Sequence, residues 1–430
     1  MTAQDIARYA LGKLGQAGAD QYSASAHTVE KREFNVDGGL FSLLRTTFDR
    51  HLDLMAIKDH RRGKVLINDF SHEAVDEAVS DCLASALASA EDQAWKLVAG
   101  EKQRFEQGAP QGDMDGLFNR SRELLENIKR DYPKVMVEQM IVTHEKAEGL
   151  YLNSLGAQYE TLEGEYAVSL MFSGHDGDKT SSFNGDGLRT VSLDRPFIEM
   201  GSLRQTLKDA EDSIDTTQPE GKFVGAVVFM PNCAQEVLSE LLSNYAGDGV
   251  VLEGTSQWLD KLGKQVVDPR LTVRLAPLDS RIVCGQRYMH DGEMSRDYAV
   301  IKDGVLQQFM LSSYVANKTD FRRAPNDAGN LIVTPGDQTL DEIIAGIDKG
   351  LLVGRFSGGQ PSSSGDFSGV AKNSFLIENG RVKGAVSETM LSGNLAGMLN
   401  HLRAISRDTV ADGSNVVPYI AVDGITISGK

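Results

Sequence analysis

Four of the Asp-Gly and Asn-Gly pairs in the second half of the chain, which lie between alternating apolar runs, constrain its fold more than any other feature of the sequence. They are Asp291-Gly292, Asp303-Gly304, Asn379-Gly380 and Asp423-Gly424. Such pairs readily adopt the positive φ angles of two-residue hairpin turns. The alternating runs "YAVIKDGVLQQFML" and "SFLIENGRVKGAV" surround two of them and are predicted to form antiparallel hairpins. The second half of the chain should therefore be rich in β-structure.

The first half of the chain mixes helical and strand-like patterns. The stretches 3–17, 71–90 and 117–132 have the apolar periodicity of helices, and alternating runs typical of strands lie between them. A polar, glycine-containing stretch at 99–116 is the best candidate for a linker. We predict an α+β fold, with a mixed N-terminal α/β region followed by a β-rich C-terminal domain. The predicted division is an N-terminal α/β domain at 1–98, a middle α/β domain at 117–213 and a β-rich C-terminal domain at 223–430.

Charge and cysteine usage exclude several classes of function. The chain has 61 acidic and 44 basic residues, so its formal net charge is −17. Because affinity for nucleic acids and for anionic membranes comes largely from lysine and arginine, we expect neither nucleic-acid nor membrane binding. The cysteines Cys82, Cys233 and Cys284 are far apart, which fits a reducing compartment. No run of the chain is apolar for long enough to span a membrane, and we expect a cytoplasmic protein.

One strand–proline–helix unit is the natural place to look for a site. The apolar run "FVGAVVFMP" leads into "CAQEVLSELLSNYAG" at 233–247, which has helical periodicity. Asn232 and Gln235 resemble a capping box, and Gly247 is placed for a C-terminal cap at C′. The predicted buried stripe consists of Val237, Leu238, Leu241, Leu242 and Tyr245. The opposite polar face, which is either solvated or part of a site, carries Glu236, Ser239, Glu240, Ser243 and Asn244.

Catalytic signatures are scarce elsewhere in the chain. None of the eight histidines pairs with another as HxH or HxxxH, so each is interpreted as a lone core or surface histidine. Cys233 and Cys284 have no activating neighbour in the sequence and are predicted to be inert buried thiols. The serine-hydrolase elbow, the P-loop and the dinucleotide fingerprint are all missing from the sequence. The Gly/Ser-rich stretch at 354–380 is either a long turn or a loop that lines a peptide cleft or a subunit interface.

Several stretches resemble the TldD/PmbA family (peptidase U62), a metallopeptidase-related family once described as modulators of DNA gyrase. The segment "GGQPSSSGDFSGVAKNSFLIENG" resembles the family's Gly-Asp-Phe-Ser and Ile-Glu-Asn-Gly block. "VSETMLSGNLAGML" resembles its Ser-Gly-Asn-Leu helix start, and "NSLGAQYET" its Asn-Ser-x-Gly turn. The segment "AGNLIVTPGDQTLDEIIAGIDKGLLV" resembles its Asn-Leu…Pro-Gly segment with the helix and strand that follow. The resemblance covers most of the chain and is weakest around 35–60 and 90–120.

The resemblance also implies that this chain lacks the family's metal site. TldD-type subunits carry His-Glu-x-x-x-His on a helix after an apolar strand and a cysteine nearer the C-terminus, which together hold a metal. In this chain Ser239 and Asn244 occupy the positions of the two histidines, and Glu240 remains in the place of the general base. The segment "SRDTVADGSNVVPY" offers no cysteine as third ligand. The resemblance therefore implies a PmbA/TldE-like branch with no catalytic residues and no metal of its own, and places zinc only in a TldD-type partner.

The function that follows from this resemblance is that of a non-catalytic subunit of a heteromeric TldD/TldE-type metalloprotease, inactive alone and involved in peptide degradation or maturation. Its expected partners are a TldD-type subunit in a heterodimer, or a second copy in a homodimer, and an unfolded peptide substrate. The alternative is a stand-alone hydrolase using Glu240, Cys233 or His290, or a homodimeric peptide-binding protein. The residues expected to bind peptide or form an interface are Asn330, Gly358, Gly359, Gln360, Ser364, Asp366 and Phe367.

Overall fold

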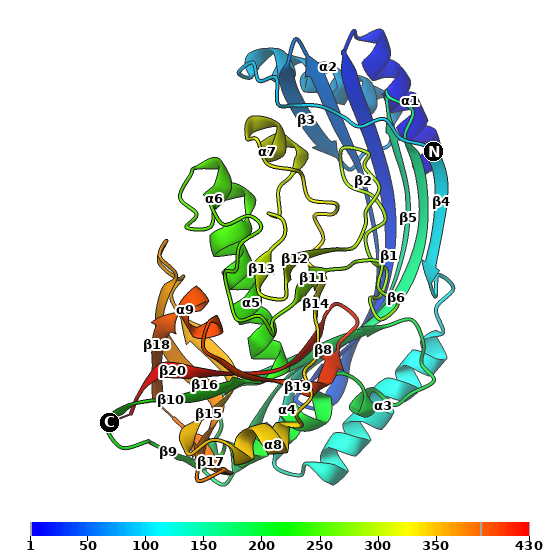
Figure 1. Ribbon diagram of the computed structural model, residues 1–430. Coiled ribbons are helices and arrows are strands. Elements are labelled where there is room, and N and C mark those ends of the chain that lie inside the picture. The colour runs from blue at the N-terminus through cyan, green and yellow to red at the C-terminus, as the bar shows by residue number, and fades with distance from the viewer. Residues whose placement is uncertain (1, 388, 430) are drawn as a thin grey trace.

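The computed structural model describes residues 2–387 and 389–429 and has the α+β fold that the sequence predicts (Figure 1). Its strands form two large sheets. The first is eight-stranded, with the order β3-β2-β1-β5-β6-β4 and with β7 and β8 paired to β6. Its strands are β1 (Gln21–Asp37), β2 (Leu40–Lys58), β3 (Arg61–Ile67), β4 (Lys102–Gly108), β5 (Val135–Asn153), β6 (Gln158–Asp176), β7 (Lys179–Thr180) and β8 (Asn184–Thr190).

Helices pack against this first sheet at its two ends, as Figure 1 shows. One group is α1 (Ala3–Gln16) and α2 (His72–Ala88), which share a core with the buried Leu52 and Leu54 of β2. Each of these helices begins at a side-chain cap, Thr2 for α1 and Ser71 for α2. The other group shares a second core, and its members are α3 (Met114–Asp131), the 3-10 turn η1 (Phe197–Glu199) and α4 (Leu203–Asp212).

The second sheet has twelve strands, in the order β13-β12-β11-β14-β20-β10-β15-β16-β17-β9 with β18 and β19 joined to it. Its strands are β9 (Thr216–Thr217), β10 (Lys222–Phe229), β11 (Val273–Leu275), β12 (Tyr298–Lys302), β13 (Val305–Leu306), β14 (Leu331–Val333), β15 (Lys349–Gly358), β16 (Asp366–Glu378), β17 (Arg381–Val386), β18 (Thr389–Asn394), β19 (Leu402–Ala411) and β20 (Val416–Ser428). The helices beside it are α5 (Pro231–Ala246), α6 (Asp248–Leu252), α7 (Ser313–Lys318), α8 (Leu340–Ala345) and α9 (Leu395–Leu399). Among the described helices, those of this half are short, apart from α5.

Two of the predicted hairpin turns are confirmed by their backbone angles. Asp303 and Gly304 join β12 to β13 with φ of 50° and 74°, and Asn379 and Gly380 join β16 to β17 with φ of 51° and 70°. Positive φ at both central residues is the property for which such pairs are selected in two-residue turns. The Asp423-Gly424 pair is different, because it lies inside β20 rather than between two strands. The prediction of a turn there is wrong: β20 continues through it, and its pairing with β10 changes register in this region.

The stretch at 99–116 is not the linker that its composition suggests. Residues Lys102–Gly108 form β4, which pairs in parallel with β6 and completes the first sheet. Glycine and polar residues in an edge strand look the same in the sequence as those in a loop. Strands from 1–98 and from 117–213 also share this one sheet. The shared sheet joins two of the predicted domains, so the division at 1–98, 117–213 and 223–430 stays a prediction about which segments fold as independent units.

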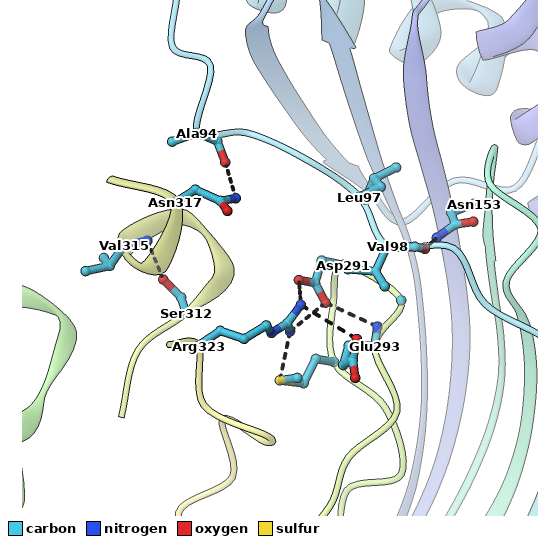
Figure 2. Close-up of polar contacts among 12 residues, drawn as sticks. Ala94, Leu97, Val98, Asn153, Asp291, Glu293, Ser312, Val315, Asn317 and Arg323 are labelled. Carbon is cyan, nitrogen blue, oxygen red and sulfur yellow. Dashed lines mark hydrogen bonds and ion pairs between the residues drawn. The ribbon is translucent and has the colours of Figure 1, made fainter. Parts of the chain in front are cut away.

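The segment just before β4 connects the two halves of the molecule (Figure 2). The Asn317 side chain donates a hydrogen bond of 2.8 Å to the carbonyl oxygen of Ala94, and the backbone N–H of Val98 donates one of 2.8 Å to the carbonyl oxygen of Asp291. Asp291 in turn forms an ion pair of 2.9 Å with Arg323. Loops of the C-terminal half are thus fastened to the edge of the first sheet.

Within the described residues every helix is too short or too polar to cross a bilayer.

Candidate functional site

Helix α5 begins directly after β10 and is capped differently from the prediction. Pro231 occupies the first turn, where its missing N–H is not needed, and Met230 is the N-cap residue without a side-chain hydrogen bond. The predicted capping box does not form, because Asn232 lies inside the helix and donates to the hydroxyl of Ser202 at 3.2 Å. Gly247 is the C-cap at a negative φ of −78°, since the chain turns at once into α6. The cap prediction was wrong because it placed the start of α5 two residues too late.

The buried face of α5 matches the predicted stripe. Leu238, Leu241, Leu242 and Tyr245 are fully buried in the largest core, and Val237 is partly buried beside them. Cys233 is also buried in this core, and burial raises its pKa far above the ordinary thiol range. Burial likewise raises the pKa of Cys284 to about 12. Because the thiolate is the reactive form, both cysteines have the character of inert thiols.

The other face of α5 borders a cavity of about 210 Å³. Three residues of the helix line it, namely Glu236, Val237 and Glu240. The remaining lining comes from β10, from the β15–β16 hairpin and from α9, and consists of Phe229, Phe356, Gly358, Gly359, Gln360, Pro361, Phe367, Leu395 and Met398. The polar face of α5 is therefore not simply solvated, and four of the residues predicted to bind peptide, those at 358–360 and 367, meet at this cavity.

The Gly/Ser-rich stretch is mostly paired strand rather than loop. β15 and β16 run antiparallel up to the pair Gly358 and Gly369, which leaves only residues 359–365 as the connecting loop. We call residues 359–365 the cavity loop. Gly365 has a φ of +86°, and a Cβ at this position would collide with the hydroxyl of Tyr245. Glycine is required there for both its conformation and its lack of a side chain.

Hydrogen bonds from α5 and from the start of α9 hold the cavity loop. Tyr245 donates to the carbonyl oxygen of Ser364 at 2.9 Å, and Asn244 donates to that of Ser362 at 3.3 Å. The Asn394 amide donates to Ser364 at 2.8 Å and to the carboxylate of Asp366 at 2.9 Å. The bonds from Asn394 and from the hydroxyl of Ser364 lower the pKa of Asp366. Of the residues predicted to bind peptide, Ser364 and Asp366 thus shape the cavity loop, whereas those at 358–360 and 367 line the cavity.

Asn244 and Ser239, at the two positions where the resemblance places histidines, are both engaged in other contacts. Ser239 accepts a hydrogen bond of 3.3 Å from the Gln235 side chain, and Asn244 holds the cavity loop. Glu240 faces the cavity and, among the described residues, has neither a hydrogen bond nor an ion pair. No group of three or more His, Cys, Asp or Glu side chains in the described part of the chain is placed to hold a metal. These residues therefore do not fit a zinc ion, which needs several imidazole, thiolate or carboxylate ligands.

Two other candidates from the sequence lie away from this cavity. Asn330 donates to the carbonyl oxygen of Ser414 at 2.9 Å, and the next residue, Leu331, donates its N–H to Asn415 at 3.0 Å. The structure therefore places Asn330 just before β14, against the loop that precedes β20, and not with residues 358–367. His290 lies close enough to His27 to help lower the pKa of His27 to about 4, although burial is the main cause. It is not part of the cavity lining.

A second polar site near the start of α5 includes three residues that the sequence did not single out, namely Asp209, Arg355 and Asn373. Glu236 and Asn232 line a second, smaller cavity of about 80 Å³ together with Asp209, Arg355 and Asn373. Asp209 is only 4% exposed, and burial raises its pKa to about 7 despite a hydrogen bond of 2.7 Å from Gln205. These residues come from α4, α5, β15 and β16, so no local sequence pattern could have grouped them.

Comparison with known proteins supports the resemblance. The model of the PmbA/TldA metallopeptidase C-terminal domain matches residues 220–429. The metalloprotease PmbA homolog of Haemophilus influenzae is 24% identical over 429 residues, which cover 95% of this chain and 89% of that protein. The solved structure of a Bacteroides thetaiotaomicron protein described as a modulator of DNA gyrase has a TM-score of 0.88, 21% identity and 99% coverage of both chains. TldE from Thermococcus kodakarensis has a TM-score of 0.85, 18% identity and the same coverage. Residues 220–429 therefore match the C-terminal domain of PmbA/TldA metallopeptidases, and the chain as a whole is similar to proteins of the TldD/PmbA family.

Proposed function

We propose that this chain is a TldE/PmbA-like, non-catalytic subunit of a heteromeric TldD/TldE-type metalloprotease that degrades or matures peptides in the cytoplasm. One observation carries the proposal. The resemblance places helix α5 where TldD-type subunits carry their metal-binding helix, and α5 offers Glu236 and Glu240 to its cavity and neither imidazole nor thiolate. A helix that keeps its place but lacks the ligands can still form part of a substrate chamber.

The contacts around α5 support a role other than catalysis. Asn244, in the place of a histidine, holds the cavity loop, so the polar face of the helix is used to build a wall. In the cavity loop, the backbone groups of Gly359 and Gln360 have no hydrogen bond within the described chain. Free backbone N–H and C=O groups can take up an extended peptide, a mode of binding that suits unfolded substrates.

An unpaired strand edge supports the need for a second subunit. Strand β3 pairs with β2 only from Leu52 to Lys58, and no described strand covers the outer side of residues 40–51. We call residues 40–51 the β2 edge. Leu44 and Phe48, which share one face of it, are 65% and 74% exposed, and Leu40, which lies on the other face beyond a bulge at 41–43, is 75% exposed. Exposed apolar residues on an open strand edge are a surface that soluble proteins normally cover. We infer that a TldD-type subunit contacts the chain here.

The β2 edge also favours one alternative, a homodimeric peptide-binding protein. Antiparallel pairing of two β2 edges around Thr46 would place Leu44 of each copy opposite Phe48 of the other. Apolar cross-strand pairs of this kind stabilise sheets. In that case the second copy, rather than a TldD-type subunit, would cover the apolar strip, and the protein would bind peptide without cleaving it.

Cleavage of an unfolded peptide distinguishes these functions. The samples are this chain, a TldD-type subunit bearing His-Glu-x-x-x-His, and their mixture, each with and without a chelator. We expect no cleavage by this chain and chelator-sensitive cleavage by the mixture at a rate well above that of the partner. A partner rate unchanged by mixing would contradict the subunit role. Cleavage by this chain alone, insensitive to the chelator, would favour the stand-alone hydrolase.

A further inference from the structure

The cavity beside α5 is lined mainly by apolar and aromatic side chains. Phe356 and Phe367 meet edge to face with ring centroids 5.5 Å apart. Phe229, Leu395 and Met398 complete its apolar part. The volume of about 210 Å³ is smaller than the roughly 300–1,000 Å³ of sites for drug-sized ligands. The cavity therefore suits one amino-acid side chain better than a complete cofactor.

Two carboxylates line this apolar space without a matching cation. Glu236 and Glu240 are four residues apart on α5 and so lie on the same side of the helix. The lining contains no lysine, arginine or histidine. Among the described residues neither carboxylate has an ion pair or a hydrogen bond. Two like charges at this spacing repel each other, and a cation between them would relieve that repulsion.

Arg355 is a candidate for neutralising the two carboxylates, but it offsets only part of the effect of burial on Glu236. It lies on the side of Glu236 that faces the smaller cavity. Its charge lowers the pKa of Glu236, but burial is the larger effect and Glu240 adds to it, so the pKa of Glu236 is raised overall. Glu240 lines only the apolar cavity and, in the part of the chain that the structure describes, has no ion-pair partner.

We propose that this cavity is a subsite for a lysine or arginine side chain of the bound peptide. The proposal rests on the proposed function, because it names a preference of the peptide-binding surface described there. The methylene stem of such a side chain packs against Phe356, Phe367 and Met398, while its charged head meets Glu236 and Glu240. Long basic side chains commonly bury their stems in this way and keep the head with polar groups. The unbonded backbone groups of Gly359 and Gln360 lie at the same cavity and can hold the peptide main chain beside it.

The test is a binding titration with matched peptides. The probe is a short, labelled, alanine- and threonine-rich peptide that is uncharged except at its central residue, which is lysine, methionine or glutamate. Its binding is followed by fluorescence anisotropy at low and at physiological salt. We expect the lysine peptide to bind about tenfold more tightly than the methionine peptide, the size typical of one charge-assisted contact. The glutamate peptide should bind most weakly. The preference for lysine should shrink as salt screens the charges.

Variants assign the preference to the cavity. Glu240→Gln and the double variant Glu236→Gln/Glu240→Gln should reduce the lysine preference to about twofold or less, since a neutral amide loses the charge–charge attraction. Glu240→Asp keeps the negative charge and should therefore keep a preference for the lysine peptide. If Glu240 had only a structural role, its charge would not affect that preference. Glu253→Gln is the matched control, because Glu253 is an exposed carboxylate outside the cavity lining.

Equal affinity for the three peptides would overturn the proposal, and so would failure of the lysine peptide to bind. So would a lysine preference that Glu240→Gln leaves unchanged. The result is separable from the proposed function. If mixing with a TldD-type subunit gives cleavage but no lysine preference exists, only the subsite is wrong. If the lysine preference is present and mixing has no effect on cleavage, the subsite stands and the subunit role falls.

Discussion

The hydroxyl of Tyr245 donates a hydrogen bond of 2.9 Å to the carbonyl oxygen of Ser364, a residue 119 positions further along the chain. The bond joins the last turn of α5 to the cavity loop. Its partner Ser364 also accepts from Asn394 at 2.8 Å, so one carbonyl oxygen connects α5, the cavity loop and the start of α9. The shape of the candidate site therefore depends on contacts between segments that are remote in the sequence.

Removing this hydroxyl should weaken the fold measurably. We expect Tyr245→Phe to lower the free energy of unfolding by about 1 kcal/mol, the net value of a typical buried hydrogen bond. The ring would keep its stacking against Trp258, whose centroid is 4.7 Å away. Urea unfolding followed by circular dichroism measures the change. Tyr9→Phe is the control, because the Tyr9 hydroxyl bonds Asp76 at the exposed surface, and a loss as large there would contradict the explanation.

Restoring the two histidines alone should not create a zinc site. In Ser239→His/Asn244→His the two imidazoles would be five residues apart on a regular α-helix, and so would not lie on one side of it. A third protein ligand of the kind zinc prefers would still be missing from the described residues. Elemental analysis after dialysis should find well under one zinc per chain, in the variant and in the unaltered protein. About one tightly held zinc per chain in either sample would show that other ligands exist.

Charges on the β2 edge should disrupt assembly. Phe48→Asp and Leu44→Asp would bury an unpaired charge in an apolar contact and should weaken binding to a TldD-type subunit at least tenfold, as expected for a loss of about 2 kcal/mol or more. Leu87→Asp serves as the control, since Leu87 is 51% exposed on α2 and away from the edge. Analytical ultracentrifugation of the mixture measures the affinity. Equal affinities for all three variants would place the subunit contact elsewhere.

The buried carboxyl of Asp209 should make stability depend on pH. Its pKa in the folded protein is raised from an ordinary 3.8 to about 7, mainly by burial. Between these two values the folded state binds more protons than the unfolded state, so its stability falls as the pH rises from about 4 to about 7. Asp209→Asn should remove this loss, and above pH 7 it should exceed the unaltered protein in stability by on the order of a few kcal/mol.

Urea unfolding of both proteins across this pH range measures that difference. The exposed Asp178 provides the control, and Asp178→Asn should leave the pH profile unchanged. Parallel pH profiles for Asp209→Asn and the unaltered protein would mean that Asp209 does not stay protonated in the fold.

Local pattern in the sequence was enough for several elements. The periodicity of 233–247 predicted which side of α5 is buried, because a helix places residues three and four apart on the same side. The pairs Asp303-Gly304 and Asn379-Gly380 predicted their turns, because few other residues tolerate two successive positive φ angles. The lack of histidine on α5, together with the resemblance, also predicts that the helix carries no metal site of its own, and this stays a prediction.

Only the tertiary structure decided which polar residues share a cavity and which strand edge stays open. The face with Glu236 and Glu240 has the same pattern in the sequence whether it meets water or Phe356 and Phe367. Asn330 and Gly358 were predicted together as peptide-binding or interface residues, but the fold places them at different sites. Lys102–Gly108 looked like a linker until β6 supplied a partner. The physical reason is the same in each case: periodicity fixes the orientation of a side chain relative to its own helix or strand, whereas neighbours come from pairing between segments far apart in the chain.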